Sequence, residues 1–461
     1  MNELSAPKKA LGGADVFLGL VCAILFADQI ATNTQMGPSV IVWWIIAAII
    51  IFIPNGLVTA ELASTYPDKG GIYAWIRRAF GSKWAARTSW FYWINIALWV
   101  PSAYVWFSGG LIGVFFPDAG YWVEVLIGVA LVWLTVWLCT KSLADSKWVI
   151  NIAGITKILI FAVIAICGVA FIVNGNQPAN VINAQTMAPT LDGGLKYLPV
   201  IIYLCCGMEI LSANSQEMRN PKKDMPRAVI GLVAICVVFN ILASLGMLNV
   251  VPVGELDIIT GVYQTMVIAL GSEPLAGFMF CLLLFSVFAQ IMVWMLGGAV
   301  GAMEAGQDGE LPKVYAKESK KSGAPIGALA LTGIVSSAVI VLYGFMAETA
   351  GDLFFTLLAF SSIVYFFPYL IMFPAFIKLR TSDSTQRAFK APAGKFLAIL
   401  CEVVLVFAVV LFVWAPDDNM GFDWGYSLSI IIGVIATVVL GEVIVNHMLK
   451  KKGRMLDRPD D

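Results

Sequence analysis

Three ionisable residues stand in the middle of long apolar stretches of this sequence, and their types suggest the chemistry that they could do. Asp28 lies in "LVCAILFADQIATNTQMG", Lys157 in "NIAGITKILIF" and Glu209 in "YLCCGMEILSANSQEM". An ionised group in apolar surroundings is costly unless a partner charge or hydrogen bonds stabilise it. A carboxylate there can bind a cation, and an ammonium can bind carbonyl oxygens. We therefore treat all three residues as candidates for a functional site.

Other polar residues give weaker signals. Glu402 and Glu442 stand near the ends of apolar stretches and fit carboxylates that reach from a helix end toward water. For Glu61 both a structural and a functional interpretation stay open. The single histidine, His447, fits a surface position, and the eight cysteines lack zinc or disulfide spacing. We expect neither a metal nor a cofactor.

The elements that position these residues follow from the composition. The 461 residues are 59% hydrophobic and 13% charged, whereas soluble domains are about 25% charged, and the mean hydropathy is +0.85. Such a chain belongs in a lipid bilayer, and its net charge of −1 offers no basic surface for nucleic acid. A membrane-spanning helix needs about 20 apolar residues. Twelve spans are predicted, at 15–35, 39–64, 84–115, 121–140, 148–173, 196–214, 227–252, 274–304, 325–347, 352–377, 395–414 and 425–448.

The direction of the spans follows from the lysine and arginine residues in the loops, which favour the cytoplasmic side. With the N-terminus inside, Lys196 is the one basic residue on the outer side and Lys157 the one deep within a span, out of 29. The outer loops are acidic or neutral, as in "AETAGD" and "APDDNMGFDW". The sequence therefore predicts a multi-pass protein of the cytoplasmic membrane with both termini in the cytoplasm.

Spans 1 and 6 contain polar residues that are unusual for a membrane helix. After Asp28 come Gln29, Thr32, Asn33, Thr34 and Gln35, and after Glu209 come Ser212, Asn214, Ser215 and Gln216. Paired interrupted helices at corresponding places in two halves of a chain are typical of the binding site of a transporter. The two segments begin about 180 residues apart, as corresponding helices of two five-helix halves would.

The chain resembles the amino acid–polyamine–organocation superfamily, in particular its glutamate/γ-aminobutyrate antiporter-like branch. The motifs that carry the resemblance are "FIPNGLVTAELASTYPDKGGIYAWIRRAFG", "YLCCGMEILSANSQEMRNPKKDMPRAV", "WMLGGAVGAMEAGQDGELPKVYAK" and "RAFKAPAGK". The resemblance implies an all-α, leucine-transporter-type fold of two inverted five-helix repeats plus two helices, with spans 1 and 6 unwound. The expected divisions are a tail at 1–14, a first repeat at 15–173, an extracellular loop at 174–195, a second repeat at 196–378, spans 11 and 12 at 379–448, and a tail at 449–461.

The same resemblance suggests which side chains form the substrate site. In related antiporters of arginine and agmatine, aromatic residues of spans 6 and 8 close over the substrate, and they correspond here to Tyr203 and Trp294. Aromatic faces suit ammonium and guanidinium groups, although both rings could instead face lipid or serve packing. We include the neighbouring Cys206 in the predicted substrate site.

One departure from the family bears on the substrate. Amino acid carriers of this superfamily often have a small-residue motif where span 1 unwinds, whose amides hold the substrate carboxylate. Here that stretch is "AILF", from Ala23 to Phe26, with Asp28 just beyond. Asp28 would repel a carboxylate and attract an amine. A brace between Asp28 and Lys157 and a protonated core acid are the two alternatives.

The leading hypothesis is a sodium-independent exchanger of small cationic amines, such as agmatine and putrescine. The alternative in the same class exchanges an amino acid for its decarboxylation product, as tyrosine for tyramine or glutamate for γ-aminobutyrate. A channel and a membrane enzyme are disfavoured, because neither a pore-segment repeat nor a catalytic cluster is recognisable. The expected partners are the small substrate and the bilayer, and a homodimer stays open.

Two charged residues have separate predicted roles. In sodium-coupled relatives a cation lies between spans 1, 5 and 8, and Lys157 is expected at that place, where it could bind carbonyls at the break and remove the need for sodium. Glu209 follows Gly207 in span 6, where a carboxylate can hydrogen-bond amides freed by the break. We expect Glu209 to be structural or gating rather than a direct ligand.

Overall fold

The computed structural model describes residues 11–141, 143–189, 197–345, 350–414 and 424–456. Within these ranges the secondary structure is helical, apart from one isolated β-bridge between Leu11 and Met218. The helices, in chain order, are α1 (Gly13–Ile24), η1 (Ala27–Gln29), α2 (Ile30–Thr34), η2 (Gly37–Ser39), α3 (Val40–Ala47), η3 (Ala48–Phe52), α4 (Ile53–Thr65), α5 (Ile72–Phe80), α6 (Ser82–Phe115), α7 (Tyr121–Leu138), α8 (Leu143–Val173), α9 (Leu198–Leu204), η5 (Ile210–Glu217), α10 (Pro221–Val250), η6 (Val253–Glu255), α11 (Gly261–Leu270), α12 (Glu273–Gln307), α13 (Ile326–Gly344), α14 (Ala350–Ser382), α15 (Gly394–Trp414) and α16 (Trp424–Leu456).

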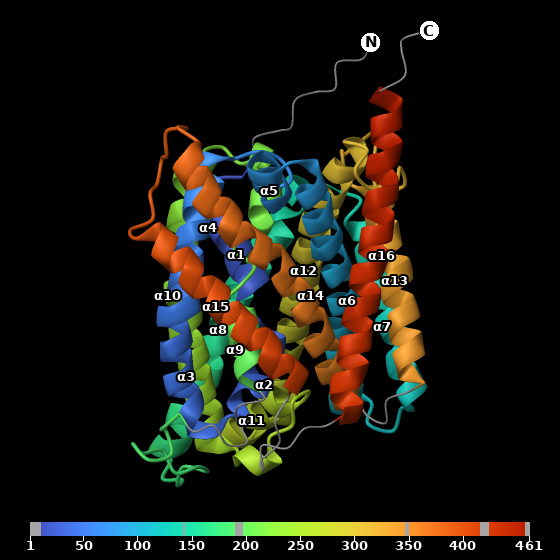
Figure 1. The fold of residues 1–461 in the computed structure, drawn as a ribbon. Coiled ribbons are helices and arrows are strands. Elements are labelled where there is room, and N and C mark those ends of the chain that lie inside the picture. Colours follow the sequence, from blue (N-terminus) through green and yellow to red (C-terminus); the bar gives the residue numbers. More distant parts are fainter. Residues whose placement is uncertain (1–10, 142, 190–196, 346–349, 415–423, 457–461) are drawn as a thin grey trace.

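The long helices run between two ends of one bundle (Figure 1). Ten helical segments of the described ranges are long and apolar enough to cross a membrane: Gly13–Thr34, Gly37–Thr65, Ser82–Phe115, Tyr121–Leu138, Ser146–Val173, Pro221–Val250, Glu273–Gln307, Leu357–Ser382, Gly394–Trp414 and Trp424–Gly453. The predicted span at 196–214 consists of the short helices α9 and η5, and that at 325–347 corresponds to α13. The all-helical, many-span architecture is confirmed, whereas the twelve-span topology and the inverted repeats stay predictions.

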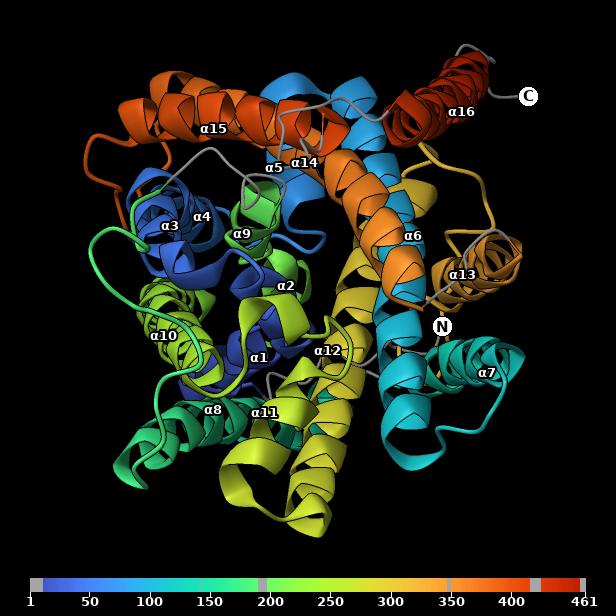
Figure 2. The ribbon, with the colours of Figure 1, turned by 90° about the horizontal axis from the view of Figure 1, so that it is seen from below.

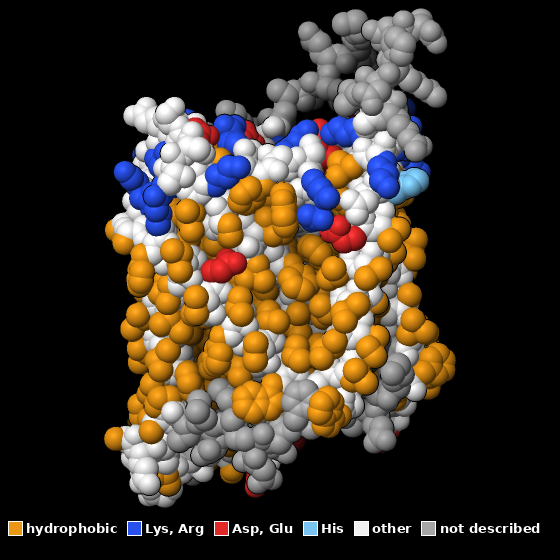
Figure 3. All heavy atoms as spheres, in the orientation of Figure 1, with side chains coloured by type: hydrophobic (Ala, Val, Ile, Leu, Met, Phe, Trp, Pro, Cys, Tyr) orange, Lys and Arg blue, Asp and Glu red, His pale blue; other side chains and the backbone are white. Residues whose placement is uncertain are grey.

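The surface of the bundle has the distribution of side chains that a bilayer requires. On the face shown in Figure 3, apolar side chains form a broad band, and lysine and arginine side chains gather above it. That basic end is the one where α1 begins and α16 ends (Figure 1). The direction across the membrane stays a prediction, and the loops "AETAGD" and "APDDNMGFDW" and Lys196 fall mostly or wholly outside the described residues.

Viewed along the bundle, helices of both halves of the chain surround its centre. Figure 2 shows α1, α2, α9 and α12 close together, with α15 and α16 at the outer edge.

Two of the weaker candidates are carboxylates that pair with arginines of other segments. Glu442 of α16 accepts hydrogen bonds from Arg87 of α6 at 2.5 and 2.8 Å. Buried Glu61 of α4 binds Arg387 beyond α14 at 2.9 Å. These contacts give both carboxylates structural partners.

The helices α8 and α10 touch backbone to backbone at two glycines. A Cβ atom on Gly168 would lie 2.4 Å from the Cα atom of Gly246, and a Cβ atom on Gly246 would lie 2.2 Å from the carbonyl oxygen of Ile164. Small residues allow this close approach in membrane helices. The contact matters for the site because α8 carries Lys157.

We predict that Gly246→Ala destabilises the protein, because the new methyl group meets backbone atoms that cannot turn away. Forced overpacking typically costs about 1–3 kcal/mol, so the melting temperature in detergent should fall. Gly254→Ala is the matched control, since nothing lies within 4 Å of a Cβ atom there. Equal melting temperatures for both variants would contradict the close contact of α8 with α10.

Candidate functional site

The first candidate segment is a helix that stops and restarts. The helix α1 ends at Ile24, and Leu25 and Phe26 have ψ angles of 83° and 97°, outside the helical range, before η1 begins at Ala27. A helix end leaves carbonyl oxygens without intrahelical partners. Because this end is buried, other groups of the protein must satisfy those oxygens.

Two side chains from distant helices bind the carbonyl oxygens at this end. The Lys157 ammonium of α8 donates to the carbonyl oxygen of Cys22 at 2.6 Å. The indole Nε1 of Trp294, on α12, donates to the carbonyl oxygen of Ala23 at 2.9 Å. The contact of Lys157 with a carbonyl at the break is the one that the sequence suggested. The break is therefore held by the protein itself.

Asp28 and Lys157 are connected through a third residue, Gln290 of α12. The side-chain amide of Gln290 donates from Nε2 to Oδ1 of Asp28 at 3.1 Å, and its Oε1 accepts a hydrogen bond from the Lys157 ammonium. The other oxygen of Asp28, Oδ2, accepts from Nε2 of Gln29 at 2.9 Å. Among the ion pairs of the described residues, none joins Asp28 to Lys157. The pairing considered from the sequence is thus indirect.

The second interrupted segment lies between α9 and η5. Gly207 has a φ angle of +99°, which residues other than glycine rarely adopt. A Cβ atom there would also lie 2.6 Å from Cδ1 of Ile24 and 2.8 Å from the ring of Trp294. Any other residue at position 207 would be strained and would clash with the end of α1 and with Trp294, so this position requires glycine.

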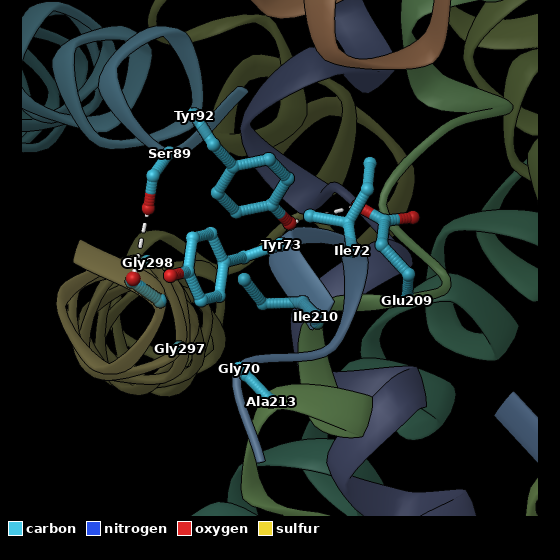
Figure 4. A pocket seen from close by; sticks show the side chains of 11 residues that line it. Gly70, Ile72, Tyr73, Ser89, Tyr92, Glu209, Ile210, Ala213, Gly297 and Gly298 are labelled. Carbon is cyan, nitrogen blue, oxygen red and sulfur yellow. Dashed lines mark hydrogen bonds between the residues drawn. The ribbon is translucent and has the colours of Figure 1, made fainter. Parts of the chain in front are cut away.

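Glu209 follows this glycine and accepts hydrogen bonds from tyrosines of two other helices. Tyr92 of α6 donates to Oε1 at 2.7 Å, and Tyr369 of α14 donates to Oε2 at 2.6 Å. Tyr365, one turn before Tyr369, lies 3.4 Å from Oε1. The freed amide of Gly207 donates to the hydroxyl of Tyr369 at 2.6 Å, so it reaches the carboxylate through Tyr369 rather than directly. Figure 4 shows the Tyr92 hydroxyl directed at Glu209.

Five aromatic rings pack together between the two interruptions. Phe26, at the break of the first segment, has its ring centroid 5.8 Å from that of Tyr203 and 6.0 Å from that of Trp294. Trp99 of α6 and Tyr365 of α14 lie 5.7 and 5.6 Å from Trp294. The two aromatic residues taken from the resemblance, Tyr203 and Trp294, therefore belong to one buried cluster and do not face lipid.

The residues predicted to bind the substrate or to act in gating are buried, and Cys206 contacts its own segment. Asp28, Tyr203 and Trp294 are each 1% exposed, and Lys157 and Cys206 are fully buried. The thiol of Cys206 lies 3.7 Å from the carbonyl oxygen of Ile202, within its own segment. Cys206 thus has a packing environment, and its role in binding stays untested.

Several buried polar atoms near the first break have no hydrogen-bond partner among the described residues. They include Oε1 of Gln29, both polar side-chain atoms of Asn33, and Nε1 of Trp99. Native proteins leave few such atoms unsatisfied, so water or a ligand usually binds them. The polar stretch after Asp28 therefore retains hydrogen-bonding capacity for water or a ligand.

A narrow cavity reaches Glu209 from the end of the bundle that carries α5. Its lining includes Tyr73, Tyr92, Glu209, Gly297 and Gly298 (Figure 4), and its water-accessible volume of about 10 Å³ suffices for about one water molecule.

At the same end of the bundle, hydrogen bonds and an ion pair join α5 and the residues before it to the end of α12 and the residues after it. Tyr73 donates to Asp308 at 2.6 Å and can donate to Glu310 at 2.9 Å, and Lys69 pairs with Glu304 at 2.7 Å. The predicted site residues themselves are buried in this structure.

Sequence reasoning missed Gln290, Phe26, Trp99 and the three tyrosines around Glu209. Gln290 could have been found, because it is the one side-chain amide in the apolar stretch "LLLFSVFAQIMVW" and lies four residues before Trp294, on the same helix face. The tyrosines carry no comparable signal, because they stand in sequence among many other aromatic residues.

Comparison with known proteins agrees with this architecture. The family model described as amino acid permease matches residues 11–437. A protein of Lactococcus lactis described as the probable agmatine/putrescine antiporter AguD is 28% identical over 94% of both chains. The glutamate/gamma-aminobutyrate antiporter of the same bacterium is 22% identical over 89% of this chain and 84% of its own.

A solved structure shares the fold. The manganese transporter of Eremococcus coleocola aligns over 95% of both chains with a TM-score of 0.59 and 12% identity. At that identity the likeness concerns the fold alone. Together with the many apolar helices, the matched model shows that the chain belongs to the amino acid permease family of the amino acid–polyamine–organocation superfamily and is a multi-pass membrane protein.

Proposed function

We propose that this protein exchanges small cationic amines of the agmatine or putrescine kind across the cytoplasmic membrane, without sodium, by alternating access. The observation that carries the proposal is the environment of Asp28. Its carboxylate is buried, and the side chains that donate to it, Gln29 and Gln290, are neutral amides. A buried ionised carboxylate is costly without a partner of opposite charge, and neither amide carries one. The amine substrate would be that partner.

The surroundings of Asp28 suit such a substrate. Phe26, two residues earlier, belongs to the aromatic cluster with Tyr203 and Trp294, and aromatic faces attract ammonium and guanidinium groups. The similarity to a probable agmatine/putrescine antiporter supports the same substrate class. The similarity to a glutamate/gamma-aminobutyrate antiporter supports the alternative, exchange of an amino acid for its amine, which the charge of Asp28 disfavours.

At the level of the fold, we propose twelve spans in two inverted repeats, with spans 1 and 6 unwound at the substrate site. The interruptions at Leu25–Phe26 and around Gly207 support this arrangement. The excess of basic residues at one end of the bundle supports an orientation with both termini in the cytoplasm.

Lys157 is proposed to replace the sodium ion of coupled relatives. It donates to the carbonyl oxygen of Cys22 and to Gln290, so it links α8 and α12 to the break in α1. Such an ammonium supplies the positive charge and the hydrogen bonds that a bound cation would supply. Gln290 bridges Lys157 and Asp28 by hydrogen bonds, so the ammonium does not contact the carboxylate directly.

Glu209 is proposed to act as a gate or structural brace rather than as a ligand. Its tyrosine partners come from α6 and α14, so the carboxylate ties the second interruption to two neighbouring helices. It lies between the aromatic cluster and the cavity toward α5. Opening of that side would require these hydrogen bonds to rearrange.

The exchange activity can be tested with purified protein in liposomes loaded with unlabelled putrescine. We expect uptake of labelled agmatine or putrescine to depend on the internal amine and to persist when choline replaces sodium. Liposomes loaded with glutamate, tyrosine or tyramine provide the comparison for the alternative. A requirement for sodium, or faster exchange of glutamate or tyrosine than of any amine, would contradict the proposal.

The role of Asp28 can be tested with Asp28→Asn, whose side chain keeps the shape and removes the charge. Loss of a charge-assisted hydrogen bond of about 1.5–3 kcal/mol should weaken amine binding roughly tenfold to over a hundredfold. Because the carboxylate has neutral amide partners, the melting temperature without substrate should change little. Asp118→Asn, at an exposed position, is the matched control.

The two measurements together separate an anchor from a brace. A large fall in the melting temperature of the ligand-free Asp28→Asn protein would show that Asp28 mainly stabilises the buried charge of Lys157. Wild-type amine affinity in a stable Asp28→Asn protein would rule out the anchor.

A further inference from the structure

The connection between α14 and α15 forms a basic pocket that the transport site does not explain. It contains the motif "RAFKAPAGK", residues 387–395. The pocket has a water-accessible volume of about 740 Å³. Its lining consists of Arg380, Thr385, Gln386, Arg387, Lys390, Ala393, Gly394, Lys395 and Phe396.

A buried carboxylate of α4 holds this connection in place. Glu61, 2% exposed, accepts hydrogen bonds from Nε of Arg387 at 2.9 Å and from the amide of Ala391 at 2.7 Å. Arg380 donates to the carbonyl oxygen of Ala391 at 2.8 Å. The non-glycine Ala393 has a φ angle of +48°, a conformation that costs free energy. These contacts fix the shape of the pocket without a ligand.

The pocket has an excess of positive charge. Four of its lining residues are basic, namely Arg380, Arg387, Lys390 and Lys395. Glu61 pairs with both of these arginines and offsets part of their charge, whereas Asp383 lies 3.7 Å from Arg78, outside the pocket lining. Hydrogen bonds from the hydroxyl and amide of Thr385 lower the pKa of Asp383 to about 2, so this carboxylate stays ionised. Among the described ion pairs, none uses Lys390 or Lys395.

The pocket lies where the basic end of the protein meets its apolar band. The helix α15 begins at Gly394 in the pocket wall. Along this helix from the pocket, the apolar side chains of Phe396, Ile399 and Val403 are 64%, 55% and 62% exposed. At the left of Figure 3, blue side chains border the orange band at the level where Figure 1 draws this connection. A molecule in the pocket would thus touch cations at one end and an apolar helix face at the other.

We propose that this pocket binds the phosphate headgroup of an anionic phospholipid from the leaflet on this side of the membrane. Lys390, Lys395 and Arg380 provide the positive charge, and the exposed face of α15 accompanies the acyl chains. Basic pockets beside membrane helices suit anionic headgroups in this way. The open, partly apolar surroundings favour a lipid over a soluble phosphate, which would gain nothing from the exposed α15 face.

The binding can be measured by titrating phosphatidylglycerol into the purified protein in a neutral detergent and following the melting temperature. Phosphatidylcholine with the same acyl chains serves as the zwitterionic comparison, and glycerol phosphate tests the headgroup chemistry alone. The variant is Lys390→Gln with Lys395→Gln, because both lysines are exposed and neither supports the fold through Glu61. The matched control is Lys320→Gln with Lys321→Gln, at exposed positions between α12 and α13.

We expect phosphatidylglycerol to raise the melting temperature of the wild type and of the control variant at the same concentration. The pocket variant should need a concentration roughly 30-fold higher, the loss expected for two basic residues near an anionic surface. An equal response of the pocket and control variants would overturn the proposal. An equal rise in melting temperature with phosphatidylcholine would also overturn it. If glycerol phosphate raised the melting temperature as much as phosphatidylglycerol at the same concentration, the pocket would be a site for a soluble phosphate instead of a lipid.

Discussion

The carbonyl oxygens left open at the end of α1 are the constraint on which the rest of the site depends. In a buried place without water they need donors, and the protein supplies the ammonium of Lys157 and the indole of Trp294. These donors come from α8 and α12, so satisfying the break also fixes how three helices meet. Trp294 packs against Gly207, which brings the second interruption to the first. The close contact of α8 with α10 supports the position of Lys157.

The two buried carboxylates, Glu209 and Asp28, have different hydrogen-bond partners, and this difference supports different proposed roles for them. Glu209 accepts hydrogen bonds from several tyrosine hydroxyls that also bind one another and the amide of Gly207. Such a satisfied network favours a positional role. Asp28 has amide partners, and in the polar stretch that follows it Oε1 of Gln29 and both polar side-chain atoms of Asn33 lack partners among the described residues. That side of the site has capacity for a cation with several N–H groups.

Much of this arrangement could be read from the sequence, and the rest could not for physical reasons. Buried charges are costly, so Asp28, Lys157 and Glu209 stood out in apolar stretches, and the many-span architecture followed from length and hydropathy. What joins these residues depends on contacts between distant segments, such as that of Asp28 with Gln290. Neutral partners carry no comparable cost and are therefore inconspicuous in sequence. The hydroxyl of a tyrosine near Glu209 is indistinguishable in sequence from one that faces lipid.

The proposed exchange depends on direct contact between the substrate amine and the carboxylate of Asp28. An experimental structure of the protein with agmatine or putrescine bound would test it most directly. We expect a substrate nitrogen within hydrogen-bond distance of an Asp28 carboxylate oxygen, with the aromatic rings of Phe26, Tyr203 or Trp294 along the carbon chain. A structure in which the amine lies elsewhere, while Gln29 and Gln290 still bind Asp28 as they do here, would contradict it.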